Sequence, residues 1–475
     1  MSAAELGKET IDILASMRID SHVGVLLGAG ASAAAGLPDW NTFAVDLLAT
    51  SGAIEDHETA RAFLAGQDPA IVAEAAKNAA GDNWTSLLKS ALYGEEPVDP
   101  APLHTAAAAL AERRGPDAIS LFTLNYDDLL ESALRNASTD FEEGEVEVFS
   151  REKSSPRAPR GAYEVHHLHG FLPPNATSSD SVILTLTDYN RLGQRRTTWQ
   201  ESALHDSLQK GPLILAGTSY RDPDIRQWIH DLTCDGESGE VLVFLAREGM
   251  GLDRVQFNRV EAALKTQWSA LGVQVIATHD YSDAAQALRE LPFVGVPGYL
   301  PPSERAAALW QTHVEDFSIL QKGDSDELNH DLETLQDLLP NFTNLTLWLA
   351  DGAGGLVRWA ANDRTYRHPE YLRRAVPGHD SDWIAGQCIG RNGQLVRDIP
   401  QAGSTARWRS VAATPLVVEF SSAPALPCGV ISAASTKQVA EEQVDDVNAV
   451  FAELSEKWSL LLEIRTGVYG QHSPL

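Results

Sequence analysis

The chain has 475 residues, which exceeds one ordinary hydrophobic core and predicts two domains. Its 37 basic and 66 acidic side chains give a net charge of −29, which repels a phosphate backbone and argues against nucleic acid as a partner. The sequence contains no signal-peptide core and no run of about 18 apolar residues, so we expect a cytoplasmic protein without a membrane partner.

The first predicted unit is a buried strand at residues 23–27, a glycine-containing loop and a helix at residues 40–51. Glycines in such a loop let the backbone approach a pyrophosphate, whose charge then sits at a helix N-terminus. The loop therefore predicts a dinucleotide site that includes Gly28, Ala29, Gly30 and Ser32.

The segment Gly36-Leu37-Pro38-Asp39-Trp40 extends this loop beyond the length of a generic dinucleotide turn. It would carry the Asp39 carboxylate and the Trp40 ring toward the far end of the dinucleotide, so both residues are candidates for cofactor binding. Asp39 has an alternative role, because an acid after proline is also common at a helix start, near the positive end of the helix dipole.

Apolar residues at helical spacing predict a helical insertion over residues 58–92 and 103–114. A strand at 118–124 then ends at Asn125-Tyr126-Asp127-Asp128, and the charged segment 150–161 indicates a loop. Further strands are predicted at 165–168, 182–186, 213–216, 241–246 and 273–277, separated mostly by helical patterns. This alternation predicts an α/β fold with a doubly wound parallel Rossmann-like sheet.

Prolines and glycines between residues 292 and 302 form the best linker, which predicts domains at 1–298 and 303–475. Beyond it we expect helices within 303–339, a strand hairpin at 345–349 and 355–359, strands at 410–418 and 429–434, and an amphipathic helix at 440–464. The second domain is thus predicted to be a smaller α+β unit.

Three histidines, His166, His167 and His169, compete for the role of a catalytic base near neutral pH. If residues 165–168 form a strand, His167 and His169 share one face and His166 lies on the other. A structural role at the strand end is the alternative for each. Asn125 could hold a ribose hydroxyl, a carboxamide or an attacking water, or it could simply close a turn.

Four segments at predicted strand ends occur in an informative order: residues 28–40, Thr123-Leu124-Asn125-Tyr126-Asp127, His167-Leu168-His169-Gly170 and Gly217-Thr218-Ser219-Tyr220-Arg221-Asp222. Over about residues 15–295 the chain thereby resembles the sirtuin-like superfamily. Asn-Tyr-Asp and Ser-Tyr-Arg-Asp-Pro-Asp are nearer its bacterial defence branch than its deacetylase branch.

The resemblance implies that NAD is bound as a substrate and destroyed. It selects His169, which precedes Gly170, and Asn125 as the catalytic residues. It also adds nucleotide-binding candidates to those of the first loop, namely Asp127, Gly217, Ser219 and Asp222. Asp127 could instead brace its loop, and Asp222 could cap the helix that follows it.

The departure from the deacetylases of that superfamily concerns their zinc ribbon, which is built on two Cys-x-x-Cys pairs. The three cysteines here, Cys234, Cys388 and Cys428, are scattered and form no such pair, so no metal is expected. Water then becomes the expected acceptor, and the predicted activity is NAD hydrolysis to nicotinamide and ADP-ribose. An NAD-dependent protein deacylase and a catalytically silent NAD or ADP-ribose sensor are the alternatives.

Residues 384–399, 410–416 and 428–432 are similar in pattern to GAF domains, which are small-molecule sensor and dimerisation modules; the similarity covers about residues 303–470. The combination implies a regulated effector of antiphage defence by NAD depletion, with an unknown small-molecule or phage-derived trigger. It also implies a homo-oligomer, in which the helix at 440–464 could pair between subunits or simply pack on its own sheet.

Overall fold

The structure is a computed structural model that describes residues 3–94, 97–138, 147–152, 158–193, 198–218, 223–234, 239–399 and 407–466. Contacts divide the chain into two compact units. The parallel-sheet unit is Ser16–Ala277, and the antiparallel-sheet unit combines Met1–Ala15 with Thr278–Leu475. The predicted domains 1–298 and 303–475 stay a prediction, although residues 278–298 pack with the antiparallel-sheet unit.

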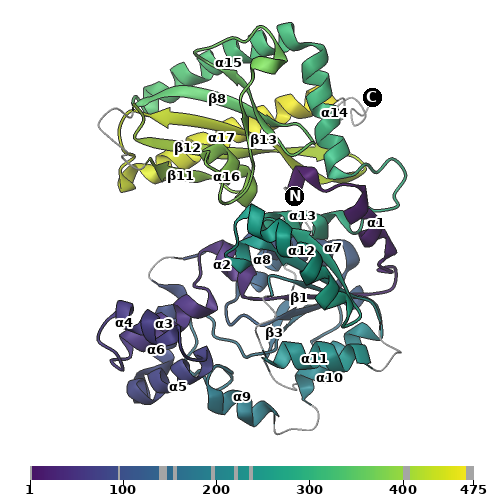
Figure 1. Cartoon of the computed structure of the whole chain (residues 1–475), viewed down its shortest axis with the longest axis vertical. Helices are drawn as coiled ribbons and strands as arrows, with labels where there is room; N and C mark the ends of the chain where they lie inside the picture. The colour runs from purple at the N-terminus through teal and green to yellow at the C-terminus, as the bar shows by residue number, and fades with distance from the viewer. Residues whose placement is uncertain are drawn as a thin grey trace. The chain divides into compact units, whose positions relative to one another are not determined.

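The parallel-sheet unit contains a seven-stranded sheet in the order β3-β4-β2-β1-β5-β6-β7 (Figure 1). The strands are β1 (Val23–Leu27), β2 (Ile119–Thr123), β3 (Val148–Arg151), β4 (Tyr163–His167), β5 (Leu213–Ala216), β6 (Val241–Ala246) and β7 (Val273–Thr278). Central β1 pairs in parallel with both β2 and β5, and it is buried along its whole length. Ligands of such sheets bind at the carboxyl ends of the strands where the strand order reverses, which here is the end of β1.

Helices flank this sheet, as Figure 1 shows, which confirms the Rossmann-like α/β class. Of the predicted insertion, residues 58–92 share a core with the helix at 40–50 that includes Phe43, Val72, Trp84 and Leu88. Residues 103–114 pack instead mainly on the helix at 129–138. The helices are α2 (Ala29–Ala35), α3 (Trp40–Thr50), α4 (His57–Leu64), α5 (Pro69–Ala80), α6 (Trp84–Tyr93), α7 (Pro102–Arg114), α8 (Leu129–Ser138), α9 (Leu186–Gly193), α10 (Trp199–Leu208), α11 (Pro223–Cys234) and α12 (Arg254–Ser269).

Two predictions for this unit are wrong. Residues 182–186 form no strand, because Val182 and Leu184 pack into the insertion core and the backbone at Ile183 bonds to His169 O and the Tyr126 hydroxyl instead of a strand. Conversely, the segment expected to be a loop at 150–161 begins inside β3, which pairs with β4. This strand has only four residues, Val148-Phe149-Ser150-Arg151, and none of them is fully buried, so it carries no apolar strand pattern.

The antiparallel-sheet unit contains six strands in the order β10-β9-β8-β13-β12-β11. They are β8 (Phe342–Ala350), β9 (Leu356–Ala361), β10 (Arg374–Ala375), β11 (Leu395–Asp398), β12 (Ser410–Phe420) and β13 (Ala423–Ser435). Its helices are α1 (Lys8–Ser16), α13 (Tyr281–Glu290), α14 (Pro302–Glu315), α15 (Phe317–Leu338), α16 (Ile384–Arg391) and α17 (Val444–Thr466). The predicted strands overlap β8, β9, β12 and β13, whereas β10 and β11 were not predicted.

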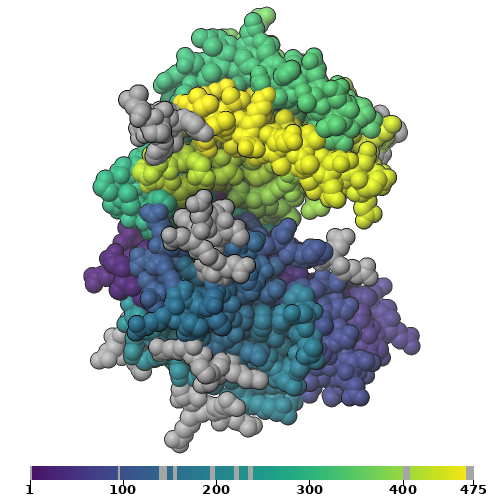
Figure 2. Space-filling model, turned by 180° about the vertical axis from the view of Figure 1, so that it is seen from behind, coloured from purple at the N-terminus to yellow at the C-terminus, as the bar shows by residue number. Residues whose placement is uncertain are grey.

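The apolar stripe of α17 packs on its own sheet: Phe451, Trp458 and Leu462 belong to the unit's core. Figure 2 shows the opposite side of α17 at the surface (yellow). The stripe is thus explained without a second subunit, and oligomerisation stays a prediction. None of the helices in the described part of the chain is long and apolar enough to cross a membrane.

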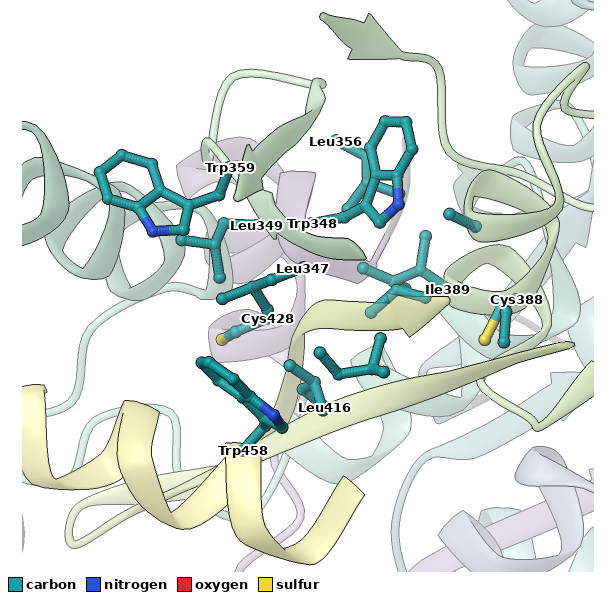
Figure 3. Packing of buried hydrophobic residues seen from close by; sticks show 14 of the residues in the cluster. Leu347, Trp348, Leu349, Leu356, Trp359, Cys388, Ile389, Leu416, Cys428 and Trp458 are labelled. Atoms are coloured by element: carbon teal, nitrogen blue, oxygen red, sulfur yellow. The ribbon is translucent and has the colours of Figure 1, made fainter. Parts of the chain in front are cut away.

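Two cysteines belong to the same core. Cys388 and Cys428 are free and fully buried, and Figure 3 shows Cys428 between Leu347 and Trp458. Burial raises the pKa of the Cys428 thiol to about 12 and that of Cys388 well above its usual value. Both therefore act as small apolar side chains rather than as nucleophiles or metal ligands.

A buried polar network ties α14, α15 and α17 to the sheet. Asp324 accepts hydrogen bonds from Trp359 Nε1, at 2.7 Å, and from the Arg465 guanidinium. Fully buried His313 donates from Nδ1 to Leu309 O at 2.8 Å and accepts from Arg465 at Nε2, 3.0 Å away. This arrangement requires a neutral imidazole.

Acidification should therefore destabilise the antiparallel-sheet unit. Burial lowers the pKa of His313 to about 4, against 6.5 when exposed, so the unfolded chain binds a proton that the folded one does not. The contribution of His313 to the free energy of unfolding is fully present above about pH 6.5. It falls by about 3 kcal/mol as the pH is lowered toward 4. Chemical denaturation of the wild type and His313→Gln at pH 7 and pH 4 measures this contribution; an equal loss in both proteins would contradict it.

Candidate functional site

The loop after β1 lies against the loop after β5. Gly28 N donates to Ala216 O and Gly30 N donates to Gly217 O, both at 2.9 Å. A Cβ atom on Gly28 would lie 2.7 Å from Gly217 O, and Gly217 itself has a φ of +69°. Glycine is therefore required at both positions for the two loops to approach this closely.

A Gly28→Ala variant should disturb this contact. The added methyl group must displace the Gly217 main chain, which typically costs about 1–3 kcal/mol and lowers Tm by several degrees. Thermal denaturation with and without NAD measures both stability and binding. Gly66→Ala is the matched control, because its Cβ would meet only Phe63 O, at 3.9 Å. Equal Tm values for the two variants would contradict the tight approach.

Three buried side chains at the ends of β1 and β2 form a hydrogen-bonded chain. Asn125 Nδ2 donates to Ser32 Oγ at 2.7 Å, and Ser32 Oγ donates to Asp127 Oδ2 at 2.7 Å. Asn125 Nδ2 also donates to Gly28 O at 3.1 Å, while the main-chain N of Asn125 donates to Thr123 Oγ1. The structure thus brings the predicted residues Gly28, Ser32, Asn125 and Asp127 together.

These contacts determine what the Asn125 side chain can offer a ligand. Both amide protons are used inside the protein, whereas Oδ1 accepts no hydrogen bond from any residue that the structure describes. Asn125 is 7% exposed, so it lies at the edge of the buried network. Its remaining capacity is that of an acceptor, which suits a ribose hydroxyl or a water molecule.

Asp127 acts as a brace in this geometry. Its Oδ2 accepts from Ser32 and its Oδ1 accepts from the main-chain N of Leu129 at the start of α8. Burial raises the pKa of the Asp127 carboxyl, although the bonds from Ser32 and Leu129 oppose that effect. The bracing alternative is therefore favoured, and a contact with nicotinamide stays a prediction.

The three histidines have different surroundings. β4 ends at His167, so the strand alternation that would place His167 and His169 on one face does not extend to His169. His167 is fully buried against Glu131 of α8, and His166 stacks near Trp199 on α10. Strand alternation therefore does not relate the faces of His167 and His169, and the expectation that they share one stays a prediction.

His169 lies in the turn after β4, beside α9 and α11. Its ring packs edge-on against Tyr189 and near Trp228, and its Nε2 is 3.6 Å from Asp224 Oδ2. The main-chain O of His169 accepts from Ile183 N, which holds the turn. Tyr189, Asp224 and Trp228 were not predicted as neighbours, because they come from helices that no local pattern connects to the histidine motif.

The remaining candidates are less well connected. Asp39 is exposed and caps α3 by accepting from Thr42 N at 2.7 Å, which realises its alternative role as a helix cap, and Trp40 packs near Phe43. Ala29 is exposed at the start of α2. Ser219 and Asp222 lie outside the described residues. The catalytic and cofactor-binding roles of all these residues stay predictions.

The comparison with known families agrees with this geometry. No curated protein matches the chain. Residues 119–276 match the family of SIR2-like domains, a range that runs from β2 to β7 and includes Asn125, His169 and Gly217. The Gly28 loop precedes the matched range. Residues 119–276 of the parallel-sheet unit are therefore similar to SIR2-like domains.

Proposed function

We propose that the protein is an NAD hydrolase that releases nicotinamide and ADP-ribose. The observation that carries the proposal is the fixed Asn125 side chain. Its amide protons bond to Gly28 O and Ser32, while its oxygen accepts no bond from the residues that the structure describes. The side chain lies at the carboxyl ends of β1 and β2, where a dinucleotide would bind, in a unit that is similar to SIR2-like domains over residues 119–276.

The chemistry follows from the bond that breaks. As the bond between C1′ of the ribose and the nicotinamide nitrogen breaks, nicotinamide leaves as a neutral molecule and positive charge develops on the ribose, as in other glycosidic cleavages. A water oxygen then bonds to C1′ and must lose a proton. Asn125 Oδ1 can orient this water or a ribose hydroxyl, and His169 can accept the proton directly or through that hydroxyl.

Water is proposed as the acceptor because the sequence lacks the paired cysteines that build a zinc ribbon beside a peptide cleft. No step in the cleavage itself requires a metal ligand. The protein's task is to orient the ribose and to stabilise the developing charge with fixed dipoles.

The test is to incubate the purified protein with NAD and to follow nicotinamide and ADP-ribose by chromatography. Hydrolysis without any peptide supports the proposal. Turnover that occurs only with an acylated peptide would instead identify a deacylase, and binding without turnover would identify a sensor. A negative result is repeated in extracts of phage-infected cells, since the enzyme could require a trigger.

We also propose that the antiparallel-sheet unit regulates this activity in antiphage defence, by sensing a small-molecule or phage-derived signal. The support is its separate compact core and the pattern similar to GAF domains within residues 384–432. Cellular NAD should fall after infection in cells that carry the wild type but not in cells that carry Asn125→Ala. Unchanged NAD in both strains would contradict a role in defence.

A further inference from the structure

A completely buried ion pair, formed by His167 and Glu131, contacts the main chain of Asn125. His167 Nε2 is 2.7 Å from Glu131 Oε1, and both side chains are 0% exposed. The other ring nitrogen, Nδ1, is 3.0 Å from the main-chain O of Asn125. Ser150 of β3 donates to the same Glu131 oxygen. The pair thus links β3, β4 and α8 to the residue proposed to orient the ribose.

The partners determine the charge of the ring. A carbonyl oxygen and a carboxylate both accept, so His167 must donate from both nitrogens, which requires an imidazolium. Burial lowers the pKa of His167, but the Glu131 carboxylate and the bonds to Glu131 and Asn125 outweigh burial and raise it. Burial acts to raise the pKa of the Glu131 carboxyl. The positive charge of His167 and its hydrogen bond lower that pKa by more, so the net shift is downward.

Other ionisable groups surround the pair. Asp127, in the loop before α8, also raises the pKa of His167. The negative charge of Glu131 also acts to raise the pKa values of three neighbours, namely Asp128, Tyr93 of α6 and His104 of α7. Burial lowers the pKa of His104 to about 4, so that ring is neutral and His167 is the cation that balances Glu131.

A buried ion pair is a poor means of adding stability, because desolvation offsets most of the attraction and apolar side chains often perform as well. It does, however, impose geometry. With Thr123 Oγ1 accepting from Asn125 N and His167 donating to Asn125 O, the main chain is held on both sides of the residue. Gly28 O and Ser32 then hold the side chain.

We propose that His167 is a positioning residue: as a doubly donating imidazolium fixed by Glu131, it holds the main chain of Asn125 so that the Asn125 oxygen faces the bound ribose. The proposal rests on the proposed NAD hydrolysis. It follows that removing a proton from His167 would impair turnover, because Glu131 retains the remaining proton on Nε2 and leaves a bare Nδ1 facing Asn125 O.

The Glu131→Gln variant separates this role from simple packing. A neutral glutamine can donate its amide to His167 Nε2, so a neutral ring can keep its proton on Nδ1 and still donate to Asn125 O. The kcat of the wild type should fall about tenfold per pH unit once the pH exceeds the raised pKa of His167. Glu131→Gln should be active at neutral pH and should lack this alkaline fall.

Ring protonation gives a second readout that does not depend on the variant. Nitrogen-15 NMR of the wild type should show His167 as an imidazolium through neutral pH, and its deprotonation should coincide with the alkaline fall in kcat. His166→Gln is the control, because that ring contacts Phe122 and Trp199 instead of Asn125. It should leave the pH profile unchanged.

The outcomes distinguish the two proposals. A wild type that releases no nicotinamide under any condition contradicts the proposed function. A wild type that turns over NAD with the same pH profile as Glu131→Gln contradicts the positioning role alone. If Glu131→Gln does not fold, the comparison of ring deprotonation with wild-type kcat decides, and deprotonation without loss of kcat overturns the proposal.

Discussion

Replacing Asn125 with alanine is expected to lower kcat for nicotinamide release by about a hundredfold to a thousandfold, the usual effect of losing one polar group that stabilises a transition state. The substitution removes the Oδ1 acceptor. It also takes a donor from Ser32 Oγ and from Gly28 O, so the loop after β1 loses a buried contact. Steady-state release of nicotinamide, measured by chromatography, gives the change.

Further variants separate chemistry from folding. Asn125→Asp keeps the size and an acceptor but places a carboxylate against Gly28 O, so it should also be impaired. Ser32→Ala removes only the brace between Asn125 and Asp127 and should cost less than either. Asn83→Ala is the control, since this side chain makes no capping bond at the start of α6. Full activity of Asn125→Ala would remove Asn125 from the mechanism.

The sequence predicted those parts of the site that a single local sequence pattern specifies. A buried strand followed by Gly28 and Gly30 specifies a close backbone approach, and Asn125 is the second residue after the next strand along the chain. Adjacent parallel strands bring their carboxyl ends together, so the meeting of Ser32 with Asn125 follows from topology. The alternating pattern likewise predicted the parallel sheet.

Contacts between distant segments could not be predicted in this way. Glu131 reads as an ordinary first-turn acid of α8, and only the fold reveals that it is fully buried against His167. Asp224 and Trp228 reach His169 from α11, more than fifty residues later in the chain. Residues 182–186 have the apolar character of a strand, but the insertion core uses them for packing.

The histidines at 166, 167 and 169 also show that the sequence alone did not predict the surroundings of each ring. The motif order selected His169, whereas the spacing alone paired His169 with His167. The structure separates them because β4 ends at His167, which is committed to Glu131 and Asn125, while His169 lies in the following turn. A ring with both nitrogens bonded inside the core is unsuited to proton transfer to a substrate, so the geometry leaves His169 as the stronger candidate.

Substitution of His169 by alanine is therefore expected to lower kcat by about a hundredfold to ten-thousandfold, the range typical of a lost general base. The ring also packs against Tyr189 and near Trp228, so the alanine variant leaves a gap and Tm must be measured beside activity. His169→Gln fills more of this space but cannot accept a proton. It should recover stability without recovering turnover.

The neighbouring histidine provides the matched comparison. His166 is one strand position before His167, with Nε2 3.5 Å from Glu164 and its ring near Trp199. Because it lies on the other face of β4 from His167, His166→Gln should change kcat by no more than about twofold. Equal losses in His166→Gln and His169→Gln would indicate a general effect of disturbing this strand end. Full activity in His169→Gln would exclude His169 as the base and would assign the proton of the attacking water to solvent, with Asn125 as the orienting group.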